Sequence, residues 1–392
     1  MSFLCAARAA LVGQSVLRRI LPLVAVVILP GLSLSCGNSS HGTPTGPNHN
    51  AYVTLPQKGS VLLLHINGAT GAITLGAQTP QVQDTTPTGL ALLPSKKFLY
   101  AVNSFANTIS IFNVASDGTL TLTGTPTQAG GSSPNAAVID PSGKYLLVTN
   151  NLTDNVSVFS IDSGSGALSP VGSPVPANAN PAEILITPSG KFVYVTNPGI
   201  GMVTAFTFSN GVLTEVKPGS PFFSGAGAFG LAVDGSERFL YVANPSASNP
   251  PPSSTTGNIS GFNIDPSTGA LTTQILGSPF TATNGSGPSA ITVDPSGRYA
   301  YATTAGSSFS IWCFSITSTN GQLVAVPNSP FSLTSGGLFA LFDPSGNYFY
   351  IGSSGSNGIA GYTYNPSTGA PTVISGSPFS TGTPPGKMVL SE

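Results

Sequence analysis

Residues 140–150 read DPSGKYLLVTN, and residues 156–161 read VSVFSI. The first four residues predict a tight turn, because Asp accepts backbone hydrogen bonds, Pro presets φ and Gly takes a position that needs a positive φ. The next seven residues are of strand-forming type, and residues 156–161 alternate between apolar and polar side chains. The stretch therefore predicts a turn followed by two neighbouring β-strands.

The same pattern occurs seven times along the chain. Each unit predicts an apolar strand, a turn, a second strand, an alternating third strand, a Gly turn and a fourth strand. Equivalent second-strand positions are 47–49 residues apart, with one spacing of 60, and are Tyr52, Tyr100, Leu147, Tyr194, Tyr241, Tyr301 and Tyr350. The turns between the third and fourth strands carry Gly71, Gly118, Gly166, Gly211, Gly269, Gly321 and Gly369.

Four short strands in about 47 residues are typical of one blade of a β-propeller. We therefore expect an all-β fold, a seven-bladed β-propeller with four-stranded blades, over residues 51–392. The first unit begins at its second strand, residues 51–54, and the last leaves an unpaired first strand, residues 387–390. The C-terminal strand is thus expected to join the N-terminal blade and close the ring, which removes exposed sheet edges.

The composition supports a turn-rich folded domain. Hydrophobic residues make up 40% of the chain and charged residues 6%, with 47 Gly and 35 Pro. Without Arg8, Arg18 and Arg19 of the leader, 9 of the 12 basic residues remain against 13 acidic ones. The chain shows no basic stripe, which argues against nucleic acid as a partner.

The N-terminus has the features of an export signal. Arg18 and Arg19 precede the apolar run Ile20–Leu34, which is short for a membrane span, and Cys36 follows small residues. Residues 1–36 are predicted to be a signal peptide of lipoprotein type with Cys36 as the lipidated residue, and residues 37–50 a flexible tether. The expected location is the bacterial cell envelope, held to the membrane by the lipid. Plain secretion and a retained transmembrane anchor remain alternatives.

Several repeats also carry a recognisable motif. Residues 194–197 read YVTN, residues 145–150 read YLLVTN and residues 241–244 read YVAN. Together with the Asp-Pro-Ser-Gly turns, they resemble the YVTN repeat of the seven-bladed lactonase family, which includes 6-phosphogluconolactonase-like enzymes. The resemblance covers about residues 51–392. It implies a central channel in which a lactone is opened by histidine, acidic and arginine side chains.

In a propeller the first strands line the channel. The first strands are expected to begin near Pro87, Pro134, Pro181, Ala228, Pro288, Gly337 and Pro385. The expected channel-lining residues are Thr88, Asn135, Glu183, Phe229, Ser289, Phe339 and Lys387. Glu183 and Lys387 are the two charged residues among them, and we expect them to face each other without touching. Glu183 is the candidate catalytic residue, as a carboxylate that could activate water.

Other polar residues fall on repeat positions that predict structural roles. Arg238 and Arg298 occupy a turn position, His65 lies on the polar side of a third strand, and the tether holds His49. The turn aspartates are Asp140, Asp234, Asp294 and Asp343, and we interpret them as turn caps. Cys313 has no partner for an intramolecular disulfide, since Cys5 lies in the leader. No metal site and no cofactor are predicted, because a zinc site needs convergent ligands.

Two functions remain open. The first is a monomeric binding or scaffold module of the envelope, which contacts a glycan or an envelope protein through uncharged loops such as 245–257. The second is a lactonase-type hydrolase that opens a lactone in the channel. The absence of histidine at the positions after each first-strand start favours the first function.

Overall fold

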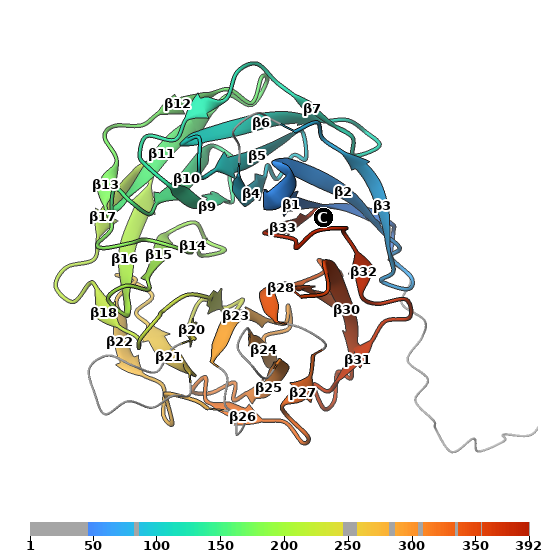
Figure 1. The fold of residues 1–392 in the computed structure, drawn as a ribbon. Coiled ribbons are helices and arrows are strands. Elements are labelled where there is room, and N and C mark those ends of the chain that lie inside the picture. Colours follow the sequence, from blue (N-terminus) through green and yellow to red (C-terminus); the bar gives the residue numbers. More distant parts are fainter. Residues whose placement is uncertain are drawn as a thin grey trace, which may run out of the picture. The chain divides into compact units, whose positions relative to one another are not determined.

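The chain forms seven antiparallel sheets arranged around a central channel, as Figure 1 shows. The computed structural model describes residues 46–81, 86–245, 257–281, 287–304, 309–333, 336–353 and 355–391. These residues belong to one compact unit. The predicted seven-bladed propeller is confirmed, and the sheets are named blades A to G in chain order.

Blades A to D contain the following strands, in order from the channel outward (Figure 1). Blade A has β33 (Met388–Leu390), β1 (His49–Leu55), β2 (Ser60–Ile66) and β3 (Ile73–Gln78), with a 3-10 turn η1 (Pro56–Lys58) after β1. Blade B has β4 (Pro87–Leu92), β5 (Phe98–Asn103), β6 (Thr108–Val114), β7 (Leu120–Leu122) and β8 (Thr127–Gln128). Blade C has β9 (Pro134–Ile139), β10 (Tyr145–Asn150), β11 (Asn155–Ile161), β12 (Leu168–Pro170) and β13 (Val175–Pro176). Blade D has β14 (Ile184–Ile186), β15 (Phe192–Asn197), β16 (Met202–Ser209), β17 (Val212–Glu215) and β18 (Phe222–Phe223).

Blades E to G follow the same order. Blade E has β19 (Leu231–Val233), β20 (Phe239–Asn244), β21 (Asn258–Ile264) and β22 (Leu271–Gln274). Blade F has β23 (Pro288–Val293), β24 (Tyr299–Thr304), β25 (Ser310–Ile316), β26 (Leu323–Ala325) and β27 (Phe331–Ser332). Blade G has β28 (Gly337–Phe342), β29 (Tyr348–Ser353), β30 (Gly358–Tyr364), β31 (Pro371–Val373) and β32 (Phe379–Ser380). Three first strands, β14, β19 and β33, begin three residues later than the sequence predicts.

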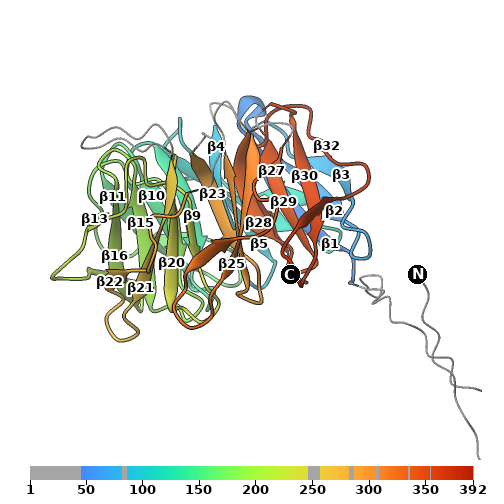
Figure 2. The same cartoon turned by 90° about the horizontal axis from the view of Figure 1, so that it is seen from below.

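The strands run between two faces of the ring, seen edge-on in Figure 2. On the mouth face, the chain enters each first strand, as at Pro87 of β4 and Pro134 of β9. On the opposite face, here called the turn face, lie the turns between first and second strands (93–97, 140–144, 187–191, 234–238, 294–298 and 343–347) and the Gly turns between third and fourth strands. Both kinds of turn lie on one face because successive strands are antiparallel.

The fourth strand is broken into two short pieces in five blades. In blade F, β26 and β27 both pair with β25, and the interruption contains Ser329 and Pro330. The Ser329 hydroxyl accepts a hydrogen bond from the Cys313 backbone at 2.9 Å, and Ser377 does the same for Gly361 at 3.0 Å. The serine before the proline at this interruption thus replaces the carbonyl that a continuous strand would supply.

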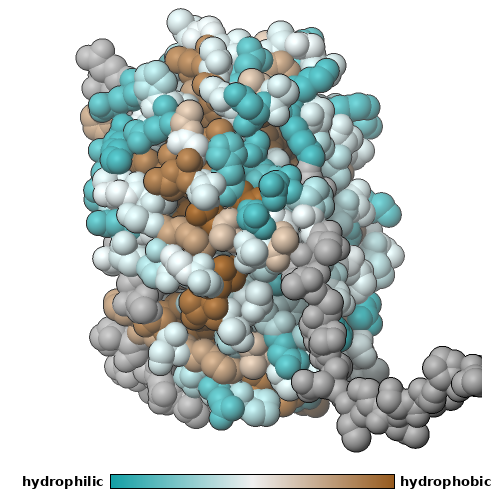
Figure 3. All heavy atoms as spheres, turned by 90° about the vertical axis from the view of Figure 1, so that its right-hand side faces the viewer, coloured by the Kyte–Doolittle hydropathy of each residue, from teal (hydrophilic) through white to brown (hydrophobic). Residues whose placement is uncertain are grey.

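The hydrophobic core is divided among the interfaces between blades. Seven clusters of buried apolar side chains are present among the described residues, and each joins two neighbouring blades. The cluster between blades E and F, for example, packs Tyr241 and Phe239 against Trp312. Apolar burial is the main favourable contribution to folding, so each blade depends on both of its neighbours. Figure 3 looks at the outer edge of the ring, where apolar side chains lie among polar ones.

Tyrosine hydroxyls connect each blade to the next. The second-strand tyrosine donates to the carbonyl of the turn glycine in the following blade, as Tyr100 does to Gly166 at 3.0 Å and Tyr241 to Gly321 at 2.7 Å. Tyr350 donates to Gly71 at 2.9 Å and so joins blade G to blade A. Blade C is the exception, because it has Leu147 at this position. The two residue types that reveal the repeat in the sequence are therefore hydrogen-bonded partners.

The ring is closed by β33, which pairs with β1 through three residue pairs. The backbone pairing extends to Lys387, whose carbonyl accepts from Thr54 at 2.9 Å. Met388 is buried in the cluster between blades A and G. The predicted closure of the N-terminal blade by the C-terminal strand agrees with this pairing.

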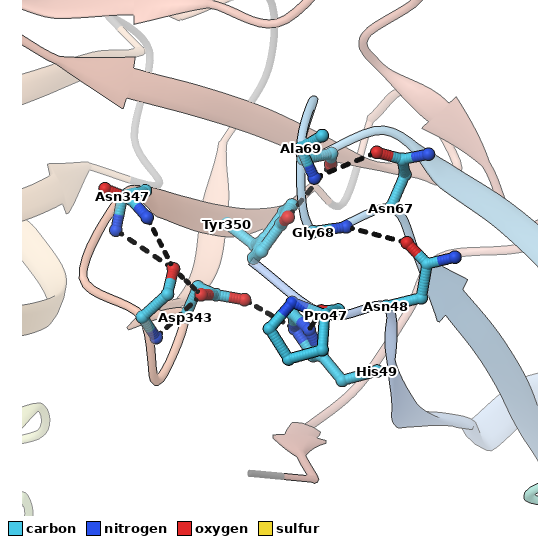
Figure 4. A network of polar contacts seen from close by, with 11 residues as sticks. Pro47, Asn48, His49, Asn67, Gly68, Ala69, Asp343, Asn347 and Tyr350 are labelled. Atoms are coloured by element: carbon cyan, nitrogen blue, oxygen red, sulfur yellow. Dashed lines mark hydrogen bonds and ion pairs between the residues drawn. The ribbon is translucent and has the colours of Figure 1, made fainter. Parts of the chain in front are cut away.

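A second contact fastens the ring between blades A and G (Figure 4). His49 Nε2 lies 2.5 Å from Asp343 Oδ2, and the Asp343 side chain is almost fully buried. The hydrogen bond to Asp343 raises the pKa of His49 above its usual value. Burial alone would raise the pKa of Asp343, but hydrogen bonds from His49 and Ser345 outweigh it and leave that pKa below its usual value.

Candidate functional site

The first strands reach the mouth face through a short irregular segment. In four blades the pairing of the first two strands shifts register there, as between Pro134 and Ala137 of blade C. Such a bulge re-aims side chains relative to a regular strand. The residue after the start lines the mouth in every blade except D, where Ala182 is buried. The residue after that is small and buried in blades B, C, E and F.

A cavity of about 390 Å³ lies at the mouth of the channel. It is lined by Pro56, Thr88, Asn135, Phe229, Pro245, Ser289, Gly337, Leu338, Gly386 and Lys387. Five predicted channel residues, namely Thr88, Asn135, Phe229, Ser289 and Lys387, are among them. Phe339 differs from the prediction, because its side chain is 4% exposed and packs in the core between blades A and G. Leu338, the preceding residue, faces the cavity instead.

Glu183 and Lys387 form an ion pair between Glu183 Oε1 and Lys387 Nζ. This corrects the expectation that the two side chains would face each other without touching. Blade D supplies Glu183 and blade A supplies Lys387, so the pair joins blades that lie three positions apart in the ring. The long lysine side chain allows this contact, whereas repeat spacing does not indicate how wide the channel is.

Both members of the pair are positioned by their backbones. The Glu183 N–H donates to Thr196 Oγ1 at 3.1 Å, and the Lys387 N–H donates to Thr54 Oγ1 at 2.8 Å. The equivalent threonine of blade C, Thr149, accepts from Ala136 at 3.0 Å. Exposed fractions of the side chains are 16% for Glu183 and 30% for Lys387. The repeat therefore provides one fixed backbone position, and in these two blades it carries a charge.

The hydroxyl hydrogens of the mouth cavity, and one of the two amide hydrogens of Asn135, are donated to backbone carbonyls. Ser289 Oγ donates to Gly337 at 2.8 Å, Thr88 Oγ1 donates to Pro134 at 3.2 Å, and Asn135 Nδ2 donates to Ala182 at 3.3 Å. These bonds join adjacent first strands around the channel. The hydroxyl lone pairs and the Asn135 carbonyl oxygen remain as acceptors. The cavity is thus suited to a ligand that donates hydrogen bonds.

The other sequence candidates lie away from the mouth. Arg238 stacks over Phe239 at 4.7 Å, and its Nε donates to Ser236 within the same turn. His65 lies on the turn face, where its Nδ1–H donates to Asn50 Oδ1 at 2.8 Å. Cys313 is buried, and burial raises the pKa of its thiol to about 12, so the thiol stays protonated and unreactive.

The turn aspartates act as caps, as predicted. Asp140 Oδ1 accepts from the backbone of Lys144 at 2.8 Å and of Tyr145 at 2.6 Å. Asp234 and Asp294 make equivalent bonds. All four also accept from the serine of their turn, as Asp343 does from Ser345, and Asp343 differs because it pairs with His49.

His49 is the residue that the sequence analysis missed. It was assigned to the tether 37–50, yet β1 begins at His49 and Gly46 already bonds Gly68 at 3.3 Å. The sequence gives no signal that β1 begins at His49, because the segment before it is polar and has no strand pattern. Residues 1–45, with Cys36, lie outside the described residues, as do 246–256 of the long mouth loop.

Among the described residues, no group of three His, Cys, Asp or Glu side chains could hold a metal ion. Within the same part of the chain, no helix has the length and apolar character needed to cross a membrane.

The fold and the channel define a seven-bladed propeller with a ligand-sized cavity at one mouth. The sequence matches the family described as "Lactonase, 7-bladed beta-propeller" over residues 41–180, 172–275 and 255–384. The chain belongs to this lactonase family. No curated protein matches the chain in sequence.

Solved structures with the same fold include two proteins described as candidate 6-phosphogluconolactonases. The one from Bacteroides uniformis has a TM-score of 0.73 and 20% identity, and the comparison covers 88% of this chain and 99% of that one. The one from Bacteroides fragilis has the same TM-score and identity, with 88% and 98% covered. The periplasmic gluconolactonase PpgL of Pseudomonas aeruginosa has a TM-score of 0.67 and 17% identity, with 88% and 99% covered. At these identities the likeness concerns the fold.

Proposed function

We propose that this protein is an exported, lipid-anchored propeller of the lactonase family that binds an uncharged, hydroxyl-rich ligand at the channel mouth without hydrolysing it. The observation that carries the proposal is the Glu183–Lys387 ion pair. These are the two charged residues at the channel-lining positions, and each neutralises the other. Neither a free base nor a free cation then faces the cavity from the described first strands.

The chemistry of the mouth cavity indicates the class of ligand. Its serine and threonine side chains present acceptors, because their hydroxyl hydrogens are already bonded to backbone carbonyls, and Asn135 adds a carbonyl oxygen and one amide hydrogen. Phe229 and Leu338 add apolar surface beside them. A carbohydrate combines hydroxyl donors with apolar ring faces, which matches both features. A glycan is therefore the proposed ligand, and the volume of about 390 Å³ fits a small one.

A glycan array tests the binding proposal. The protein should bind a subset of neutral glycans, and Phe229→Ala should weaken that binding because it removes the aromatic surface. Val212→Ala is the matched control, since this exposed apolar residue lies in the outer strand β17. Absence of any glycan binding, or equal loss in both variants, contradicts the proposal.

Lactone hydrolysis is the second candidate function, and it would use the same two side chains. A carboxylate and an ammonium group lie together in the channel of a lactonase-family chain. On this alternative, Lys387 would polarise the lactone carbonyl and Glu183 would remove a proton from the attacking water. The substrate would first have to separate the two side chains, which is why binding without hydrolysis is preferred.

An assay with a panel of neutral and acidic lactones separates the two candidates. Under the binding proposal, the protein and the Glu183→Gln variant give the same rate as buffer. Glu237→Gln is the matched control, because it removes a carboxylate from the turn face. Hydrolysis that Glu183→Gln abolishes and Glu237→Gln leaves intact would replace binding with catalysis as the function.

Export and lipidation rest on the leader. Arg18 and Arg19, the apolar run and Cys36 support a lipoprotein signal. Cys36→Ser should release the protein from the membrane fraction and prevent incorporation of labelled fatty acid. Continued membrane association of that variant would favour a retained transmembrane anchor, and an unlipidated wild-type protein would favour plain secretion.

A further inference from the structure

Blade A differs from the other blades on the turn face. Its first two strands, β33 and β1, come from opposite ends of the sequence, so no turn joins them. In the other six blades that position is occupied by a turn such as 93–97 of blade B. The junction of β33 and β1 is here called the seam. A cavity of about 540 Å³, the seam cavity, lies beside it between blades A and B. Its lining includes Asn48, His49, His65, Lys96, Lys97 and Ser391. It opens on the face opposite the channel mouth.

Two lysines of blade B lie on one side of this seam cavity. In blades C, E and F, the turn before the second strand begins with an aspartate. In blade E this aspartate lies near the basic residue of its turn, with Arg238 Nε 4.0 Å from Asp234 Oδ2. Blade B has Leu93 at the aspartate position and two lysines in the same turn. Neither Lys96 nor Lys97 has an ion-pair partner among the described residues.

Two acidic residues lie near the cavity. Asp343 is paired with His49 across the interface of blades G and A. Asp117 accepts from the backbone of Thr119 at 2.9 Å and keeps its negative charge. The positive charge of Lys96 reaches His49, where it acts against protonation of the imidazole. Lys96 and Lys97 outnumber the one unpaired carboxylate, so the seam cavity carries a net positive charge.

The backbone at Lys96 supplies an independent observation. Lys96 has φ +60°, in the left-handed region, where four other blades have Gly143, Gly190, Gly297 and Gly346. A side chain there costs about 1 kcal/mol relative to glycine. The other exception is Glu237, with φ +57°, and its carboxylate bonds Ser189 Oγ at 2.7 Å in the neighbouring blade. Glu237 thus uses its side chain for a contact, whereas Lys96 directs its charge to a cavity.

We propose that the seam cavity binds a small oxyanion, the carboxylate or phosphate group of a ligand, through Lys96 and Lys97. Each ammonium group offers three hydrogen-bond donors and a full charge to the oxygens. Asn48 and His65 line the same cavity and supply neutral polar groups beside the lysines. The volume exceeds that of the oxyanion alone and leaves room for a sugar-sized substituent.

Calorimetric titration of the full-length protein tests the proposal with three probes: inorganic phosphate, galacturonate and, as the neutral control, galactose. Phosphate or galacturonate should bind, and galactose should not bind at this cavity. Binding of phosphate alone assigns a phosphate ligand, and binding of galacturonate alone assigns a carboxylate. The double variant Lys96→Gln/Lys97→Gln should lose at least about tenfold in affinity, because it removes both charges.

The matched control is Lys144→Gln/Lys191→Gln, which removes the same charge from equivalent turns of blades C and D. Its affinity should equal that of the wild type. Lys96→Gly separates binding from folding, since it should weaken binding while it raises the melting temperature by relieving the left-handed residue. Failure of both anions to bind, or equal losses in the two double variants, overturns the proposal.

Discussion

Blade A and the other six blades solve the same packing problem with different connections. Each of the six is continuous in sequence, and a turn holds its first strand to its second. Blade A is assembled from the N-terminal strands and the three-residue β33. It retains the interface features of the repeat, because Tyr52 donates to Gly118 and Tyr350 donates to Gly71, both at 2.9 Å. The interface between blades is thus independent of chain connection.

Blade A has no turn between β33 and β1, but it has an ion pair between its His49 and Asp343 of blade G. Asp343 of blade G keeps the bond from the backbone of Ser345 but pairs with His49, whereas Asp140, Asp234 and Asp294 also cap the residue four positions on. One repeat position thus combines a local cap with a contact between blades G and A. Four sets of variants test whether the contacts that close the ring stabilise the protein less than the contacts between the other blades, equally, or in a way that depends more on pH.

Removal of residues 385–392 should have the largest effect. The deletion exposes the inner edge of β1 and the apolar surface that Met388 and Leu390 cover, which costs on the order of several kcal/mol. Thermal unfolding followed by circular dichroism should show a large fall in the melting temperature. Deletion of residues 391–392 alone is the control. An unchanged melting temperature after the longer deletion would mean that β33 does not close the ring.

Glu183→Gln or Lys387→Met should have the next largest effect. Each leaves one charge without its partner at the mouth, at a cost of about 2 kcal/mol for a partly buried pair. Urea unfolding should show most of this loss restored in the double variant Glu183→Gln/Lys387→Met, which has no unpaired charge. A double variant as unstable as the sum of the two single ones would argue that the pair contributes no coupling.

Tyr350→Phe and Tyr241→Phe should destabilise the protein equally. Each leaves a buried glycine carbonyl without its side-chain donor, Gly71 at the interface of blades G and A and Gly321 in the repeat, at a cost of about 1–2 kcal/mol. Tyr145→Phe is the control, because Tyr145 packs edge-on against Phe208 and its hydroxyl makes no hydrogen bond among the described residues. A markedly larger loss for Tyr350→Phe would show that the interface of blades G and A depends on its tyrosine more than the repeat does.

His49→Gln should have the smallest effect, and the effect should depend on pH. The pKa of His49 is raised in the folded protein above the value of 6.5, so its contribution is fully present below that value. The contribution is lost as the pH rises through the raised pKa, and should be on the order of 1 kcal/mol. The difference in stability from wild type should therefore be larger at about pH 5.5 than at about pH 9.

Asp294→Asn is the control for this pH dependence, since Asp294 caps its turn without a histidine. Its effect should show no loss between these two pH values, because a cap to backbone N–H groups does not titrate there. A difference for His49→Gln that stays constant with pH would exclude a charged His49 from the seam.

The repeat made the fold predictable, because strand patterns, turn residues and the tyrosine register recur at nearly constant spacing. The partnership between Tyr100 and Gly166 was not predictable from either residue, since it joins different blades. The Glu183–Lys387 contact depends on channel width, which repeat spacing does not determine. His49 lies next to a polar segment, so pattern alone could not assign it to a strand. Phe339 faces the core because the bulge changes which of two adjacent residues faces the channel.

The position of Lys387 next to the closing strand has a consequence for biogenesis. During synthesis Glu183 leaves the ribosome long before Lys387 does. A partial product that contains Glu183 but not Lys387 carries the channel carboxylate without its counter-ion, and the ion pair forms in the step that also pairs β33 with β1. Charge balance in the channel is thus established together with ring closure.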